Sequence, residues 1–186
     1  MAYWRQYPRQ TAAIAILAIG LATIGGAWAF EVIGGYVPCP LCLQERIPYY
    51  VGLPLALVAL VLGARPWPSR VALLLTAVTF LVSAGLGVYH AGAEWSWWAG
   101  PTSCAAAGGA AGSVGDLLDS LERIRVVSCT DASWRFPDVP WGLSFAGWNA
   151  AISALLAVIG LWGALAMKPA PAARRSPDYG SSSVSQ

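Results

Sequence analysis

Two cysteines and an arginine form the segment of this sequence best suited to redox chemistry. Cys39 and Cys42 stand two residues apart in Pro-Cys-Pro-Leu-Cys-Leu-Gln-Glu-Arg, and Arg46 ends this segment. A CxxC pair can close a small disulfide or present a reactive thiolate. Arg46 is the only Lys or Arg between Arg9 and Arg65, and a cation at the edge of an apolar segment is costly unless its charge is used. The segment is therefore a candidate site of thiol–disulfide exchange.

A second cysteine pair, Cys104 and Cys129, lies much further along the chain. Cys104 stands in a stretch of small residues, and such a stretch has little to bury. Residues 113–127 have apolar side chains at helical spacing, which predicts a short amphipathic helix next to Cys129. This helix either lies flat in the membrane interface or covers the mouth of a bundle. Exchange needs a reachable sulfur, which we expect of Cys104 in this stretch but not of Cys42, which leads into a helix.

The composition predicts an integral membrane protein. The 186 residues are 57% hydrophobic and 11% charged, whereas a soluble domain has about 25% charged residues. The net charge is +2 and the basic residues are not clustered, which excludes a nucleic-acid partner.

Four apolar runs are each long enough to cross about 30 Å of hydrocarbon. They cover residues 12–30, 47–64, 71–89 and 143–167. We expect an all-α, four-transmembrane-helix bundle in one domain, residues 1–167, with the amphipathic helix in its second outer loop and a disordered tail, residues 168–186. A cleaved signal peptide is the alternative for the first run, but three equally apolar runs follow it. In the second run we expect Pro48 in the first helical turn and a kink at Pro54.

The distribution of basic residues predicts the orientation in the membrane. Seven basic residues lie in the N-terminal head, the second loop and the tail: Arg5, Arg9, Arg65, Arg70, Lys168, Arg174 and Arg175. Four lie in the first and third loops: Arg46, Arg123, Arg125 and Arg135. Cytoplasmic segments carry the excess of Lys and Arg. Both termini are then cytoplasmic, and all four cysteines lie on the outer, oxidising side, where disulfides persist.

Together these features resemble the DsbB family (disulfide bond formation protein B) of membrane thiol oxidoreductases. The resemblance rests on C-x-x-C-x-x-E-R at Cys39–Arg46, on Cys104 and Cys129 around the amphipathic segment, and on residues 141–149 at the entry to the last run. It implies a bacterial inner-membrane enzyme that oxidises a periplasmic, thioredoxin-fold, DsbA-like dithiol protein. The electrons would pass to the membrane quinone pool, as ubiquinone or menaquinone.

The resemblance also implies a role for each cysteine. Cys104 matches the cysteine that forms the mixed disulfide with the partner, and Cys129 matches its resolving mate. Cys39 matches the thiol that exchanges with this loop pair. Cys42 matches the thiol beside the quinone.

Four further polar residues accompany the cysteines. Arg46 matches the arginine beside the quinone; its competing interpretation is an arginine that reaches lipid phosphates. His90 matches a polar neighbour of the quinone; its competing interpretation is an interfacial histidine with satisfied hydrogen bonds. Glu45 and Glu94 are expected to be solvated or interfacial, with a proton relay as the alternative.

Other functions remain as alternatives. A zinc site with four cysteine ligands is possible by count, but Cys104 and Cys129 lack the close spacing of a second ligand pair, so we predict no metal. A non-catalytic membrane scaffold would hold two structural disulfides. A quinone reductase of the vitamin K epoxide reductase type would carry its CxxC near the C-terminal end of the bundle, whereas here it follows the first run.

Overall fold

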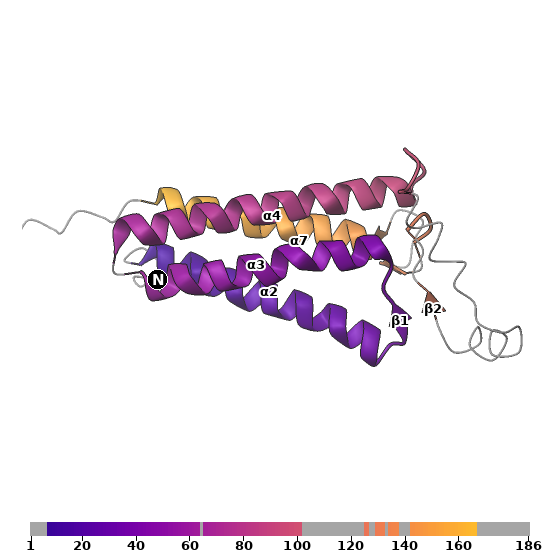
Figure 1. Ribbon diagram of the computed structural model, residues 1–186, viewed down its shortest axis with the longest axis horizontal. Helices are drawn as coiled ribbons and strands as arrows, with labels where there is room; N and C mark the ends of the chain where they lie inside the picture. The colour runs from indigo at the N-terminus through magenta and orange to yellow at the C-terminus, as the bar shows by residue number, and fades with distance from the viewer. Residues whose placement is uncertain are drawn as a thin grey trace, which may run out of the picture.

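The computed structural model describes residues 7–63, 65–101, 125–126, 129–132, 134–137 and 142–166. Within these residues, four long helices lie side by side as a bundle (Figure 1). They are α2 (Pro8–Val32), α3 (Pro40–Val61), α4 (Pro66–Glu94) and α7 (Phe145–Leu165). Helix α4 packs against α3 and α7, and α2 packs against the same two helices. Successive helices run in opposite directions, so the α2–α3 connection and the segment between α4 and α7 lie at the same end (Figure 1).

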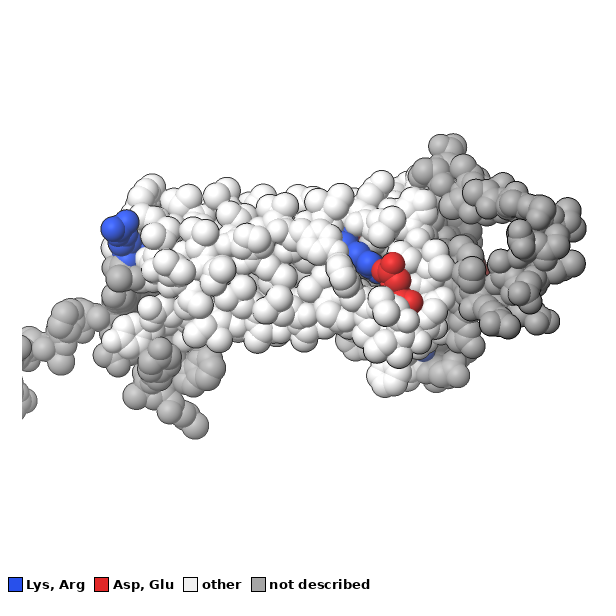
Figure 2. All heavy atoms as spheres, turned by 60° about the horizontal axis from the view of Figure 1, so that its bottom comes forward, with Lys and Arg blue, Asp and Glu red and all other residues white. Residues whose placement is uncertain are grey.

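Helices α2, α4 and α7 are long and apolar enough to cross a membrane. Helix α3 does not meet the same criterion within the described residues, because each of its 18-residue windows includes Gln44, Glu45 and Arg46. The outward faces of the bundle carry large apolar side chains such as Leu21 and Leu81. Figure 2 shows that one face has few charged side chains along its length. The prediction of a mostly helical membrane protein is therefore confirmed, with three candidate membrane-spanning helices among the described residues.

Helices α3 and α4 extend beyond the predicted apolar runs at the cysteine end. Helix α3 begins at Pro40, with Cys39 as its N-cap residue, so Pro40 rather than Pro48 occupies the first turn. The expectation for Pro48 is wrong, and Pro48 lies in the helix interior with Pro54. Helix α4 extends through His90 to Glu94. The apolar runs underestimate the length of both helices, because polar residues at the cysteine end continue the helical backbone and bond partners inside the bundle.

Among the described residues, four two-residue strands lie between the helices at the cysteine end. Strand β1 (Tyr36–Val37) pairs in parallel with β2 (Arg125–Val126), and β3 (Arg135–Phe136) pairs antiparallel with β4 (Leu143–Ser144). The helix predicted over residues 113–127 is therefore wrong for Arg125 and Val126, whose backbone pairs with β1 instead. The rest of that helix and the predicted tail lie outside the described residues.

Small residues allow close contact between the helices. At Gly87 of α4, a Cβ atom would lie 2.8 Å from the backbone nitrogen of Ala150 in α7. Nearby, the Ser153 hydroxyl donates to the Ser83 hydroxyl at 2.9 Å. Interfaces between membrane helices use small side chains for close approach and hydroxyl groups for hydrogen bonds. The α4–α7 contact follows this pattern and fixes how close these helices approach.

We predict that Gly87→Ala lowers the free energy of unfolding by about 1–3 kcal/mol, the usual cost of overpacking. The added methyl group would meet the Ala150 backbone, which cannot move without shifting α7. Gly85→Ala is the matched control, because nothing lies within 4 Å of the Cβ position at Gly85. Thermal unfolding in detergent measures both variants, and equal midpoints would contradict the prediction.

Candidate functional site

The CxxC pair occupies the N-terminus of α3. Cys39 has an extended backbone as the N-cap residue, and its sulfur accepts a hydrogen bond from the Cys42 backbone N–H at 3.1 Å. The sulfur that accepts this N–H is thus that of Cys39, not that of Cys42. The partial positive charge of the helix N-terminus stabilises an anion at this position. The local sequence thus favours a thiolate on Cys39.

The two CxxC sulfurs are free thiols in direct contact. Their Sγ atoms lie 2.6 Å apart, and neither takes part in a disulfide. The Cys39 side chain is buried, and Cys42 is half-buried. Cys129, in contrast, is disulfide-bonded. The site therefore combines a reduced pair with an oxidised cysteine.

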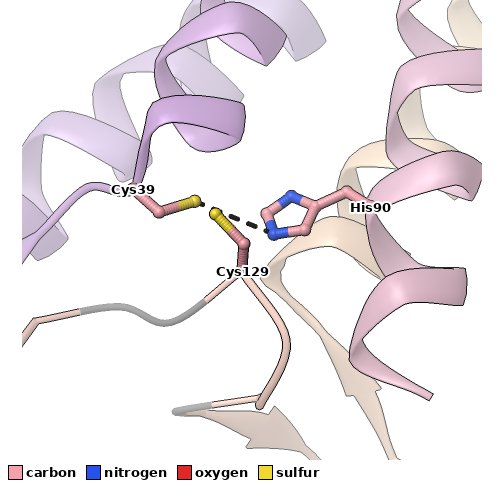
Figure 3. Close-up of side chains that lie close together, drawn as sticks. All are labelled: Cys39, His90 and Cys129. Atoms are coloured by element: carbon pink, nitrogen blue, oxygen red, sulfur yellow. Dashed lines mark hydrogen bonds between the residues drawn. The ribbon is translucent and has the colours of Figure 1, made fainter. Parts of the chain in front are cut away.

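His90 brings Cys39 and Cys129 together with α4. The Cys39 sulfur lies 3.8 Å from His90 Nε2, and one ligand atom each from Cys39, His90 and Cys129 lie within 4.8 Å of one another. In Figure 3 the Cys129 sulfur lies beside the Cys39 sulfur, next to the imidazole ring. Three such donors could bind a metal, but Cys129 in a disulfide offers no thiolate. The arrangement suits sulfur exchange, which requires a thiolate near a disulfide sulfur.

The other ring nitrogen of His90 bonds a carboxylate of α3. His90 Nδ1 lies 2.8 Å from Glu45 Oε1, and both side chains are buried. A carboxylate only accepts hydrogen bonds, so Nδ1 carries a hydrogen, and Nε2 faces the Cys39 sulfur. The second buried carboxylate, Glu94, accepts a hydrogen bond from Ser144, the N-cap residue of α7. The expectation that Glu45 and Glu94 are solvated or interfacial is therefore wrong.

The pKa of Cys39, which precedes the first residue of α3, is lowered from 9.0 to about 5. The largest cause is the hydrogen bond with the Cys42 side chain. Burial of the sulfur acts in the opposite direction, and the hydrogen bond and charge of His90 lower the pKa further. Cys39 is therefore the thiolate of the pair at neutral pH.

A cavity of about 300 Å³ lies on the other side of Cys42. Its walls come from α2, α3, α7 and the β3 region and are mostly apolar. The aromatic part of the wall contains Phe30, Trp134 and Phe145, whose rings contact one another. A mostly apolar cavity of this size with a few polar groups is typical of a small-molecule site.

Helix α3 presents its polar side chains to this cavity at regular spacing. The lining residues of α3 are Cys42, Glu45, Arg46 and Tyr49. Positions i, i+3, i+4 and i+7 share one helical face. This spacing is the signal in the sequence that could have identified Tyr49 as a site residue and placed Glu45 inside the bundle instead of in solvent.

Arg46 is held at the cavity by an ion pair. Its Nη1 atom donates to Glu31 Oε2 of α2 at 2.5 Å. Arg46 is mostly buried, whereas Glu31 is half-buried. A guanidinium has five N–H donors, so the pair fixes the side chain and leaves further donors for a ligand. The sequence did not indicate Glu31 as the partner.

Helix α7 adds a buried amide to the cavity. Tyr49 donates its hydroxyl hydrogen to Asn149 Oδ1 at 3.0 Å. Asn149 lines the cavity, and its buried Nδ2 has no hydrogen-bond partner in the part of the chain that the structure describes. Asn149 and Glu45 interact electrostatically without a hydrogen bond of normal geometry. A ligand with a carbonyl oxygen would satisfy this donor.

The structure thus brings most of the predicted site residues to one end of the bundle. Cys39, His90 and Cys129 form one cluster, and Cys42 and Arg46 line the adjacent cavity. His90 contacts Cys39 and Glu45 and is not among the residues that line the cavity. Cys104 lies outside the described residues.

Comparison with known proteins gives one family. The family model described as disulfide bond formation protein DsbB matches residues 9–163. Disulfide bond formation protein B of Marinobacter nauticus is 31% identical over 155 residues, which cover 79% of this chain and 85% of that protein. The protein of the same name from Nitrosococcus oceani is 26% identical over 138 residues, 72% of this chain and 78% of that protein. The uncharacterized protein RP370 of Rickettsia prowazekii is 32% identical over 81 residues, 44% of this chain and 45% of that protein. No solved structure matches the chain significantly.

We predict that the Cys39 thiolate of the reduced protein titrates with a midpoint near pH 5 instead of near 9. A lowered pKa means that the thiolate persists above this pH and is lost only on further acidification. His90→Gln removes a contact that favours the thiolate, so its midpoint should rise. Ultraviolet thiolate absorbance against pH measures the titration, with Cys39→Ser as the control that should lack it. A midpoint near 9 in the unmodified protein would contradict the assignment.

Proposed function

This chain belongs to the DsbB family of disulfide bond formation proteins, and we propose that it is a membrane thiol:quinone oxidoreductase. It reoxidises a periplasmic, thioredoxin-fold, DsbA-like dithiol protein and passes the electrons to a membrane quinone, ubiquinone or menaquinone. One observation carries the proposal. The free CxxC pair lies between a disulfide-bonded cysteine on one side and an apolar cavity with polar anchors on the other.

The sulfur contacts support a relay through two cysteine pairs. Cys104 forms the mixed disulfide with the partner, and Cys129 resolves it. Cys39, beside Cys129, exchanges with this loop pair. The observed combination of free Cys39 and Cys42 with disulfide-bonded Cys129 fits the stage at which electrons have reached the CxxC pair and have not yet left it.

The cavity residues fit a quinone. The apolar walls suit its ring, and Arg46 and the Nδ2 group of Asn149 offer donors for carbonyl oxygens. A bound quinone supplies an acceptor that takes up two electrons and two protons to become a quinol. Cys42, which lines the cavity, is the thiol of the pair that reaches it. The fixed charge of Arg46 stabilises negative charge beside Cys42.

The positions of the described chain ends support an inner-membrane protein with four spans, both termini in the cytoplasm and the cysteine loops in the periplasm. Arg9 in the first turn of α2 donates to the Ala166 carbonyl oxygen at 3.4 Å, so the described ends meet. Arg65, the N-cap residue of α4, also lies at the end of the bundle opposite the cysteines. With α3 as the fourth span, Glu45 and Arg46 in its first turns face protein and cavity instead of lipid.

The free state of Cys39 and Cys42 argues against a non-catalytic scaffold with two structural disulfides. A structural CxxC disulfide would have no need of a buried histidine beside the sulfur or of an apolar cavity beside its second cysteine. The DsbB resemblance and the site geometry therefore favour the oxidoreductase.

We predict that purified protein reduces a soluble quinone when a reduced thioredoxin-fold dithiol protein is added, and that Cys42→Ser abolishes this activity while the protein stays folded. Cys104→Ser should lose the mixed disulfide with the partner but keep quinone binding. Quinone absorbance follows the reaction, and alkylation followed by electrophoresis follows the mixed disulfide. Full activity of Cys42→Ser would refute the proposed function.

We also predict that Arg46→Gln raises the KM for quinone by roughly 10- to 100-fold, because a hydrogen bond to a charged group contributes about 1.5–3 kcal/mol. The kcat should change less, since Cys42 is untouched. Arg65→Gln is the matched control at the opposite end of the bundle. An unchanged KM in Arg46→Gln, or an equal rise in Arg65→Gln, would remove Arg46 from the quinone site.

A further inference from the structure

The two thiols of the CxxC pair differ in their access to the cavity. Cys42 lines it, whereas Cys39 is 4% exposed, caps α3 and is not among the lining residues. Closing the Cys39–Cys42 disulfide releases one electron pair and two protons. The proton of Cys42 leaves beside the cavity. The proton of Cys39 needs another route.

His90 offers the first part of this route. Its Nε2 atom lies 3.8 Å from the Cys39 sulfur, and its Nδ1 atom lies 2.8 Å from Glu45 Oε1. An imidazole can receive a proton at one nitrogen and release a proton from the other. With 1% exposure, His90 is shielded from solvent, which would otherwise take the proton.

Glu45 offers the second part. Its carboxylate accepts from His90 on one side, and the same residue lines the cavity. Among the described residues, Glu45 is the one that both bonds His90 and reaches the cavity. The polar side chains therefore form a continuous path from a buried sulfur, across the α3–α4 interface, to the place where a proton is consumed.

We propose that His90 and Glu45 form a proton relay that carries the proton of the Cys39 thiol to the cavity. The inference rests on the proposed function. The S–H bond of Cys39 breaks and its proton joins Nε2; the Nδ1 proton moves to the Glu45 carboxylate; Glu45 then delivers a proton to the acceptor. The two sulfurs give up one electron pair to the acceptor as their S–S bond forms.

The competing route is direct proton transfer between the two sulfurs, which lie 2.6 Å apart. The lowered pKa of Cys39 argues against it. A Cys39 thiolate accepts the hydrogen bond from the Cys42 thiol, so the Cys39 proton has left, as the first step of the relay, for a group other than Cys42. His90 is its other hydrogen-bonding side chain among the described residues.

Glu45→Gln tests the relay, because a glutamine keeps a hydrogen-bond acceptor for His90 but cannot carry the proton. Glu94→Gln is the matched control: Glu94 is also buried, lies one turn beyond His90 on α4 and bonds Ser144, but does not line the cavity. Thermal unfolding checks that both variants are folded.

The first readout needs no quinone. Infrared difference spectra compare the dithiothreitol-reduced protein with the oxidised protein. We expect a carboxyl band that depends on the redox state, shifts in heavy water, disappears in Glu45→Gln and persists in Glu94→Gln. A band that survives in Glu45→Gln overturns the relay. Should Glu45→Gln not fold, His90→Gln replaces it, and a band that persists there overturns the relay as well.

The second readout is single-turnover reduction of saturating quinone by the prereduced protein. General acid–base groups contribute roughly 10²- to 10⁴-fold, so Glu45→Gln should be slower by at least about 10²-fold, with Glu94→Gln close to the unmodified protein. Equal rates in Glu45→Gln and the unmodified protein overturn the relay. Absence of quinone reduction by the unmodified protein would instead refute the proposed function, and the infrared band would still decide on the relay.

Discussion

The hydrogen bond between His90 and Glu45 joins α3 to α4 at the cysteine end and positions both halves of the site. Inside an apolar bundle, a buried donor or acceptor without a partner costs about 1–3 kcal/mol. His90 and Glu45 avoid this cost through each other, and the second ring nitrogen of His90 is then directed at the Cys39 sulfur. One contact thus fixes the register of two helices and the surroundings of the reactive thiol.

Helix α3 separates two kinds of chemistry by position along its first turns. The N-cap residue Cys39 is on the side of His90 and Cys129, where sulfur exchange takes place in the proposed mechanism. Cys42 and Arg46, within the first two turns, face the apolar cavity. The two sulfurs remain in contact across this boundary. A short helical segment can therefore connect a protein disulfide with a lipid-soluble acceptor.

Below the site, small and polar side chains hold the helices in place. The Tyr49 hydroxyl lies 3.1 Å from Ser153, which in turn donates to Ser83, so α3, α7 and α4 are linked by hydrogen bonds. Gly87 permits α4 and α7 to approach closely at the same level. Without a hydrophobic driving force between helices in lipid, such packing and hydrogen bonds supply the association. The positions of the helices that form the cavity walls therefore depend on helix–helix contacts outside the site.

The sequence by itself determined the membrane class, the apolar helices and the redox cysteines, because composition, run length and CxxC spacing are local properties of the chain. It also indicated Arg46 and His90 as functional positions. Only the tertiary structure decided that α3 begins at Pro40 with Cys39 as its N-cap residue, that Glu45 and Glu94 are buried, and that Arg125 and Val126 pair with β1. These features depend on partners supplied by distant segments: His90 for Glu45, Ser144 for Glu94 and Glu31 for Arg46. A polar residue at the end of an apolar run can face solvent or the bundle interior with the same local sequence, and the free energy of burying it depends on whether a partner is there.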